Sequence, residues 1–266
     1  MARDATVTIL IPHYQTLDAI RLCLRSIRRY TQPPYRVLVL DNGSRDASID
    51  YLRSLAWIEW VGTGVANDLV SAQAAALNFG AARVDTPCFL VIHSDTYVHR
   101  PGWLEFLVAR LRAGGYAAAG TRHQTIRVYD SALLAALAAH SAPWLARAGS
   151  RAVGDGVPWL RSCLALYRTD AFRAAGCRFA SDGQVDATHA VNAALAAAGE
   201  RLLELPDRAV GYYVFHKGDT TRIANRLYRS DDAEFRDRIG RHHRHVDGFR
   251  ARPSTLAILA DPSLDR

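Results

Sequence analysis

Residues 6–15 read TVTILIPHYQ, an apolar run rich in β-branched side chains that ends in Pro12, His13 and Tyr14. Residues 17–29 follow with apolar side chains at helical spacing and arginines on the other face, so the two segments predict a strand and then a helix. This alternation continues with predicted strands at 36–41, 57–61 and 88–93 and predicted helices at 46–55 and 70–83. Such a pattern is typical of an α/β fold, with a mostly parallel sheet covered by helices on both faces.

The pattern loosens after Pro101. We expect strands at 117–121, 163–167, 201–205 and 210–216, helices at 103–111, 131–147, 169–175 and 186–198, and a Gly-rich loop at 149–156. No repeat and no linker rich in Pro, Gly and Ser divides the chain. We therefore expect one main domain over 1–221, made of halves 1–100 and 101–221, and a tail at 222–266 that is at least partly helical.

The charge is unevenly distributed along the chain. The 266 residues hold 33 Lys and Arg against 26 Asp and Glu, a net charge of +7, but residues 1–100 hold 10 basic and 9 acidic groups. Residues 222–252 hold nine Arg and five acidic residues. Three interpretations of this tail stay open: a solvated helix beside the functional site, a surface for an anionic acceptor such as a lipid phosphate, and a nucleic-acid contact. The acidic residues interspersed among the arginines argue against the nucleic-acid contact.

The cysteine and hydropathy patterns indicate the cellular compartment of the protein. The four cysteines lie far apart in sequence and form no CxxC pair, so we expect buried thiols in a reducing environment. No apolar stretch approaches the roughly 20 residues of a membrane span. These patterns favour a cytoplasmic protein, and a basic tail adds peripheral contact with the inner membrane face as an alternative.

Polar side chains stand at the ends of three predicted strands, at His13-Tyr14, at Asp41-Asn42 and at His93-Ser94-Asp95. Open parallel sheets bind ligands at the carboxyl ends of their strands, where loops and helix N-termini converge. The chain has neither a GxGxxG nor a GxxxxGK[ST] loop, which argues against a dinucleotide dehydrogenase and a P-loop nucleotidase.

The order of these segments resembles the family 2 glycosyltransferases of the GT-A fold. The resemblance covers about residues 6–221 and rests on IPHYQ (11–15), DNGSRD (41–46), AAALNFG (74–80), HSDTYVHRPGWLE (93–105), GQVDATHAVNAALAAAGERLLELP (183–206) and VFHKGDTT (214–221). It implies a Rossmann-like GT-A sheet and inverting transfer of a sugar from a nucleotide-diphosphate donor, assisted by Mn²⁺ or Mg²⁺. The expected acceptor is a glycan, a lipid-linked molecule or a small molecule, and a homodimer is among the expected assemblies.

The resemblance also suggests donor-binding residues. Asp41 can accept hydrogen bonds from a ribose hydroxyl or a base N–H, and Tyr14 can cover a ring face. An Asx turn for Asp41 and core packing for Tyr14 are the alternatives. The complete predicted donor set is Pro12, His13, Tyr14, Asp41, Asn42, Ser44, Asn78 and Ser94.

Asp95, His93 and His216 are the candidate metal ligands. The family's pattern is Asp-x-Asp, and His93 stands where its first acid is expected, so the need for Mn²⁺ or Mg²⁺ is open at this stage. His216 matches the family's late histidine. The alternative is that it is an ordinary histidine at a strand end.

Asp186 is the candidate general base. It matches the family's acidic position at the start of the predicted helix, while Val185 takes the place of a second acid. A helix N-cap is the alternative role for Asp186, and Asp182 is the alternative base. The reduced set of acids keeps a rival function open, a non-catalytic module that binds nucleotide-sugars or glycans.

Overall fold

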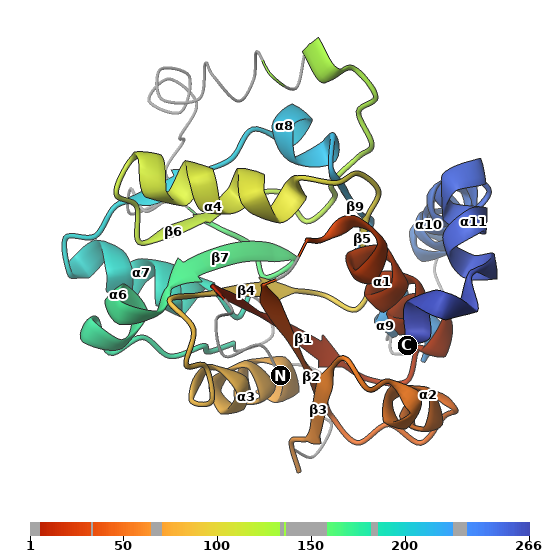
Figure 1. Ribbon diagram of the computed structural model, residues 1–266, viewed down its shortest axis with the longest axis horizontal. Coiled ribbons are helices and arrows are strands. Elements are labelled where there is room, and N and C mark those ends of the chain that lie inside the picture. The colour runs from red at the N-terminus through yellow and green to blue at the C-terminus, as the bar shows by residue number, and fades with distance from the viewer. Residues whose placement is uncertain are drawn as a thin grey trace.

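The computed structural model describes residues 6–32, 34–64, 71–133, 136, 159–181, 186–225 and 233–266. Its centre is a seven-stranded mixed sheet in the order β3-β2-β1-β4-β7-β6-β8 (Figure 1). The strands are β1 (Val7–His13), β2 (Tyr35–Asp41), β3 (Glu59–Gly62), β4 (Cys88–Ile92), β6 (Ala118–Gly120), β7 (Leu164–Arg168) and β8 (Leu202–Glu204). The α/β class and the mostly parallel sheet that the sequence predicted are confirmed.

The parallel strands end together at one edge of the sheet. β1 pairs in parallel with both β2 and β4, and His13 lies opposite Asp41 in the β1–β2 register. β7 then runs antiparallel to β4 and β6. A separate two-stranded sheet joins β5 (Thr96–Val98) to β9 (Val214–His216), with Thr96 opposite His216. This pairing brings segments that are distant in sequence to the end of β4.

Alternating side chains of the strands enter two hydrophobic cores. Ile9 and Ile11 pack in a core with α1 (Leu17–Tyr30), α2 (Ser48–Ser54) and α4 (Trp103–Ala113). Leu10 points to the other face, in a core with α3 (Ser71–Ala81), α6 (Thr169–Ala174) and α7 (His189–Ala197). The two-residue period of a strand produces this division, and both faces of the sheet are covered (Figure 1).

The C-terminal residues pack against the first helix. They form α10 (Ala233–Arg250), α11 (Pro253–Ala260) and a 3₁₀ turn (Pro262–Asp265), which lie beside α1 in Figure 1. Arg25 of α1 donates to Asp265 through Nε at 2.9 Å and to the carbonyl oxygen of Leu259 at 2.6 Å. The predicted helical character of the tail is confirmed.

Two predicted elements differ in the structure. The strand expected at 210–216 is a short helix, α8 (Asp207–Gly211), followed by β9. Pro206 precedes this helix with an extended backbone, and a Cβ atom on Gly211 would lie 2.0 Å from the carbonyl oxygen of Arg127. The helix expected from 186 begins only at His189.

The remaining expectations concern the middle of the chain and the cysteines. Most of the helix expected at 131–147 and the loop expected at 149–156 lie outside the described residues. All four cysteines are buried free thiols, as expected. Within the described ranges, none of the helices combines the length and the apolar character that crossing a bilayer requires.

Candidate active site

Asp41 and Ser44 join the loops that follow β1 and β2. The buried Asp41 carboxylate accepts hydrogen bonds from the backbone N–H groups of Gly43 and Ser44, each at 3.1 Å. The Ser44 hydroxyl in turn accepts the backbone N–H of Gln15 at 2.9 Å. The Asx-turn alternative for Asp41 is therefore present in the structure, and the turn holds its carboxylate at the carboxyl edge of the sheet.

His13 and Asp46 organise the same edge. His13 Nε2 lies 2.8 Å from the Ser48 hydroxyl, and burial lowers the pKa of His13 to about 4, so its imidazole is neutral at pH 7. Its Nδ1 atom is buried and has no hydrogen-bond partner among the described residues. The Asp46 carboxylate accepts the backbone N–H of Leu17 at 3.2 Å and that of Ser48 at 3.3 Å, so one side chain satisfies the first N–H group of both α1 and α2.

The other predicted donor residues have differing surroundings. Pro12 and Tyr14 are partly exposed, whereas Asn42 and Ser94 are buried. The Asn42 side-chain oxygen accepts the Thr63 hydroxyl at 2.8 Å. Tyr14 thus keeps part of its surface available, and Asn42 ties the end of β2 to the end of β3.

Asn78 of α3 is held by backbone groups. Its amide nitrogen donates to the carbonyl oxygen of Phe179 at 2.8 Å, and its amide oxygen accepts the N–H of Phe179 at 2.9 Å. Both polar atoms of the Asn78 side chain therefore hold the segment around Phe179 against α3.

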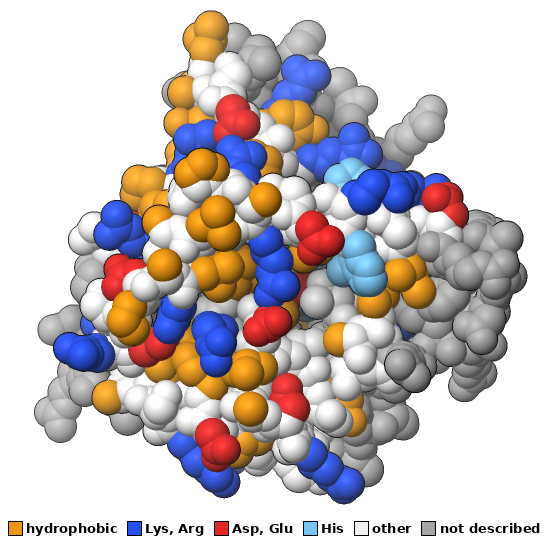
Figure 2. Space-filling view, turned by 90° about the vertical axis from the view of Figure 1, so that its right-hand side faces the viewer, with side chains coloured by type: hydrophobic (Ala, Val, Ile, Leu, Met, Phe, Trp, Pro, Cys, Tyr) orange, Lys and Arg blue, Asp and Glu red, His pale blue; other side chains and the backbone are white. Residues whose placement is uncertain are grey.

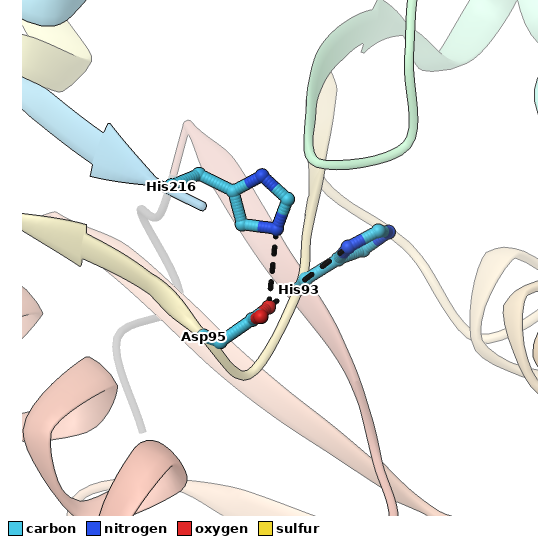
Figure 3. A group of neighbouring side chains, drawn as sticks. All are labelled: His93, Asp95 and His216. Carbon is cyan, nitrogen blue, oxygen red and sulfur yellow. Dashed lines mark hydrogen bonds and ion pairs between the residues drawn. The ribbon is translucent and has the colours of Figure 1, made fainter. Parts of the chain in front are cut away.

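His93, Asp95 and His216 lie together, as the sequence predicted (Figure 3). Asp95 Oδ1 lies 3.1 Å from His216 Nε2 and 4.0 Å from His93 Nδ1, and the three ligand atoms are all within 4.8 Å of one another. His93 and Asp95 flank the turn between β4 and β5, while His216 ends β9. The β5–β9 pairing therefore creates the cluster.

Hydrogen bonding around His216 suits it to bind a metal. Its Nδ1 lies 2.6 Å from the carbonyl oxygen of Gln124, which can only accept, so Nδ1 carries a proton. Nε2 faces Asp95. A backbone carbonyl that fixes the far nitrogen of a ligating imidazole is the usual arrangement in metal sites. Two imidazole nitrogens and one carboxylate oxygen are donors that Mn²⁺ accepts, so the residues fit a divalent ion.

The three side chains are electrostatically coupled. Burial alone would raise the pKa of Asp95, but the neighbouring His216 and His93 and the Thr220 N–H lower it below its usual range. Burial would lower the pKa of His216, but Asp95 raises it well above the ordinary value. For His93, burial and then the charge of His216 lower the pKa to about 4, so this imidazole is neutral at pH 7.

Asp186 lies before α7 rather than in it, so the prediction that it starts the helix is wrong in this detail. Its Oδ1 accepts the backbone N–H groups of Ser162 and Thr188, each at 3.1 Å, and its Oδ2 accepts the Ser162 hydroxyl at 3.0 Å. The N-cap residue of α7 is Thr188, so the N-cap alternative for Asp186 is wrong, and Asp186 instead forms a turn with Thr188. Asp186 is close to the metal cluster, because His93 Nε2 lies 2.8 Å from the same Ser162 hydroxyl. Asp182 lies outside the described residues.

A family model described as "Glycosyl transferase family 2" matches residues 8–176. The chain belongs to glycosyl transferase family 2. It is a glycosyltransferase, and solved structures of similar fold agree with this assignment. A search of curated protein sequences gave no match.

Three solved structures of glycosyltransferases illustrate the shared fold. The mannosyltransferase PcManGT from Pyrobaculum calidifontis, in complex with GDP-Man and Mn²⁺, is 19% identical with a TM-score of 0.56, and the match covers 97% of this chain and 75% of that one. Residues 1–349 of S. aureus TarS, in complex with UDP-GlcNAc, are 14% identical with a TM-score of 0.54. The match covers 96% of this chain and 79% of that one. Glucosyl-3-phosphoglycerate synthase from Mycobacterium tuberculosis, in complex with phosphoglyceric acid, is 17% identical with a TM-score of 0.51. The match covers 83% of this chain and 75% of that one. Of a longer TarS structure this chain covers 46% of the length.

The glycosyltransferase also has residues around this site that the sequence analysis missed. Gln73 and Ser162 contact His93, Gln124 holds His216, and the Thr220 N–H donates to Asp95 Oδ2 at 3.4 Å. His242 of α10 is buried, and its Nε2 lies 3.1 Å from the Thr220 hydroxyl. Thr220 lies in VFHKGDTT (214–221), which was a signal in the sequence, whereas the other residues belong to no motif.

Proposed function

We propose that this glycosyltransferase is an inverting, metal-assisted enzyme that moves a sugar from a nucleotide-diphosphate donor to an acceptor hydroxyl. The observation that carries the proposal is the convergence of His93, Asp95 and His216 at the carboxyl edge of the sheet, where the loops after β1 and β2 also end. Its domain is proposed as residues 1–221, with 1–100 forming the donor half.

Asp41, Asn42 and Ser44 would bind the nucleoside part of the donor, with Tyr14 against a ring face. The Asx turn leaves room for a donor at Asp41, because an ionised carboxylate offers about four lone-pair positions. Pro12, His13 and Ser94 would line the same site. Asn78 is left out of this proposal, since backbone groups of Phe179 occupy both ends of its amide.

His93, Asp95 and His216 would hold Mn²⁺ or Mg²⁺ beside the diphosphate. A bound divalent ion supplies positive charge that stabilises the departing nucleotide diphosphate. The donor half needs such charge, because residues 1–100 are nearly neutral, with 10 basic and 9 acidic groups. Two imidazole ligands favour Mn²⁺ over Mg²⁺, since Mg²⁺ prefers oxygen donors.

Asp186 would take the proton of the acceptor hydroxyl. The acceptor oxygen would form a bond to the anomeric carbon from the face opposite the diphosphate, as the bond to the phosphate oxygen breaks, which inverts the configuration. The hydrogen bonds to Asp186 from Ser162 and Thr188 orient its carboxylate. General-base catalysis of this kind contributes typically about 10²- to 10⁴-fold to the rate.

A nucleotide titration tests the donor and metal sites. We expect at least one of UDP, GDP and dTDP to bind, to bind more tightly with Mn²⁺, and to lose this enhancement in Asp95→Ala. Calorimetry measures both effects. No binding of any of the three, with or without Mn²⁺, would exclude the proposal. Slow hydrolysis of the matching donor without acceptor distinguishes an enzyme from a module that only binds.

A second test concerns the base. Asp186→Asn keeps the shape of the side chain but removes its basicity, so we expect turnover to fall about 10²-fold or more. Donor affinity should stay within about threefold of wild type. Donor hydrolysis and calorimetry on the same preparation give both values. Retained turnover would mean that another acid is the general base, and Asp182 would be tested first.

A further inference from the structure

Arg161 places a positive charge beside the proposed base. Its Nη1 atom lies 3.9 Å from Asp186 Oδ2, beyond hydrogen-bond distance, and 28% of its side chain is exposed. Its Nε donates to the carbonyl oxygen of Arg122 at 3.3 Å. A guanidinium carries five N–H groups, and among the described residues neither Nη1 nor Nη2 of Arg161 forms a hydrogen bond. In this part of the chain, the N–H groups on both Nη atoms are therefore available to a ligand.

The Arg161 guanidinium is held in place by an aromatic ring and by its own backbone. Its Cζ atom lies 4.1 Å from the centre of the Trp159 ring, so the cation rests against the face of that ring. Trp159 in turn packs edge-on against His189, with 5.3 Å between the ring centroids. The backbone N–H of Arg161 donates to the carbonyl oxygen of Thr121 at 2.7 Å. A guanidinium anchored in this way loses less conformational entropy when it binds a ligand.

The hydrogen bonds of Asp186 indicate which of its oxygens can take a proton. Oδ1 accepts the backbone N–H groups of Ser162 and Thr188 and the Thr188 hydroxyl. Among the described residues, Oδ2 accepts only the Ser162 hydroxyl, so of the roughly four lone-pair positions of the carboxylate the one left is on Oδ2. This is the oxygen nearest to Arg161. An acceptor hydroxyl hydrogen-bonded to Oδ2, at about 2.7 Å, would lie within about 7 Å of Arg161 Nη1.

We propose that Arg161 binds an anionic group of the acceptor, a phosphate or a carboxylate, while a neighbouring hydroxyl of the same acceptor faces Asp186 Oδ2. A guanidinium matches the oxygens of either anion with two parallel hydrogen bonds, and such charge-assisted bonds are stronger than those to neutral hydroxyls. The inference rests on the proposed role of Asp186 and deepens it, because it names the chemical class of the acceptor. The enzyme should select acceptors whose receiving hydroxyl lies close to a phosphate or a carboxylate.

Modification of arginines by phenylglyoxal tests the site in the wild type, without donor or metal. The probes are inorganic phosphate, glycerol 3-phosphate and glycerate, with neutral glycerol as the reference, and mass spectrometry of peptides gives the modification rate at Arg161. We expect at least one of the anions to slow this rate about threefold or more, because a bound ligand protects by mass action, and glycerol to have no effect. Arg112, on the exposed surface of α4, is the internal control and should react alike in all conditions. Unchanged modification of Arg161 with all three anions would overturn the proposal.

Variants measure how much Arg161 contributes to anion binding. Calorimetry with the anion that protects best should show about 10- to 100-fold weaker binding in Arg161→Gln, the range for a lost hydrogen bond to a charged group. Arg161→Lys keeps the charge but not the planar fork, so its affinity should lie between those of Arg161→Gln and wild type. Arg112→Gln is the matched control and should bind like wild type, and circular dichroism checks that each variant is folded. Equal anion affinities of wild type and Arg161→Gln would contradict the proposal.

Sugar transfer from the donor that the nucleotide titration identifies distinguishes the sources of the anionic group. Preference for glycerol 3-phosphate or glycerate over glycerol indicates a soluble acceptor, and preference for vesicles of phosphatidylglycerol over phosphatidylcholine indicates a lipid acceptor. In either case Arg161→Gln should raise the acceptor KM more than it lowers kcat. A lower kcat at unchanged KM would mean that Arg161 acts only through Asp186, and it would overturn acceptor binding. The failure of the proposed function is distinguishable, because it appears as the absence of nucleotide binding, whereas protection of Arg161 is measured without a donor.

Discussion

Two imidazoles and one carboxylate give the candidate metal site a smaller negative charge than an Asp-x-Asp pattern would. Only Asp95 can contribute an anion, because the other two candidate ligands are imidazoles. The Gln124 carbonyl and Ser162 each contact the outward nitrogen of one imidazole. In the proposed metal site, such fixed ligand orientation would offset part of the missing negative charge.

The single buried residue His99 should make the free energy of unfolding depend on pH. It is buried with Nε2 3.2 Å from the carbonyl oxygen of Gly211, and burial lowers its pKa from 6.5 to about 4. The unfolded chain therefore binds a proton that the folded chain does not, and the stabilising effect of a neutral His99 is lost as pH falls from about 6.5 toward 4. For one proton the free energy of unfolding changes by at most about 1.4 kcal/mol per pH unit.

His99→Gln should show a shallower decline of the unfolding free energy between pH 7 and pH 5. Urea denaturation followed by circular dichroism at several pH values measures this slope. His245→Gln, which removes an exposed histidine, is measured alongside as the control. Identical slopes for wild type and His99→Gln would show that His99 titrates alike in the folded and unfolded states.

Sequence predicted which candidate ligands lie together better than it predicted the residues that hold them. Asp41 ends one apolar run and Asp95 comes three residues after another, so their place at one sheet edge follows from the strand pattern. Ser162 and Gln73 carry common side chains that belong to no motif. Their contacts with His93 depend on how β7 and α3 pack around β4, and local sequence does not contain that information.

At the scale of elements, Asn78 connects α3 to the segment around Phe179. Asn78→Ala removes two hydrogen bonds and leaves the backbone groups of Phe179 without these partners, so we expect the unfolding free energy to fall by about 1–3 kcal/mol. Nucleotide affinity should stay within about twofold. Urea denaturation and calorimetry measure the two quantities, with exposed Arg83→Ala as the control. Unchanged stability with tenfold weaker nucleotide binding would instead return Asn78 to the donor site.

The strands that sequence predicted well are those with continuous apolar runs, such as β1 and β4. The segment 210–216 has the composition of a strand, but Pro206 and the close approach of Gly211 to Arg127 favour a helix at its start. The antiparallel pairing of β4 with β7 joins residues far apart in the chain, Cys88 with Arg168. Tertiary packing decides such pairings, so periodicity alone did not reveal them.

At the scale of the whole molecule, the C-terminal segment belongs to the packed structure. On the face that includes α10 and α11, basic and acidic side chains are interspersed in the described part, rather than gathered into one basic patch (Figure 2). His242 of α10 contacts Thr220, and the Thr220 N–H donates to Asp95. This arrangement favours the interpretation of the tail as a helix that packs beside the site over the other two.

The ion pair of Arg25 with Asp265 attaches the end of the chain to α1. Asp265 accepts Arg25 Nε at 2.9 Å and the Tyr51 hydroxyl at 2.9 Å, and the side chains of Arg25 and Asp265 are 10% and 23% exposed. Asp265→Asn removes the charge and weakens charge-assisted hydrogen bonds, so we expect a loss of about 1–3 kcal/mol in unfolding free energy. Urea denaturation at pH 7 measures it.

Asp237→Asn is the matched control, because Asp237 pairs with Arg241 on the exposed surface of α10, where such pairs contribute about 0.3–0.5 kcal/mol. Burial raises the pKa of Asp265, but the hydrogen bonds from Arg25 and Tyr51 outweigh it and leave the pKa below its usual range. The difference between wild type and Asp265→Asn should therefore persist at pH 7 and shrink as pH falls below about 4, where the carboxylate is protonated in the unfolded chain. A loss no greater than that of Asp237→Asn would mean that apolar packing of α11 on α1, and not this ion pair, holds the C-terminal segment in place.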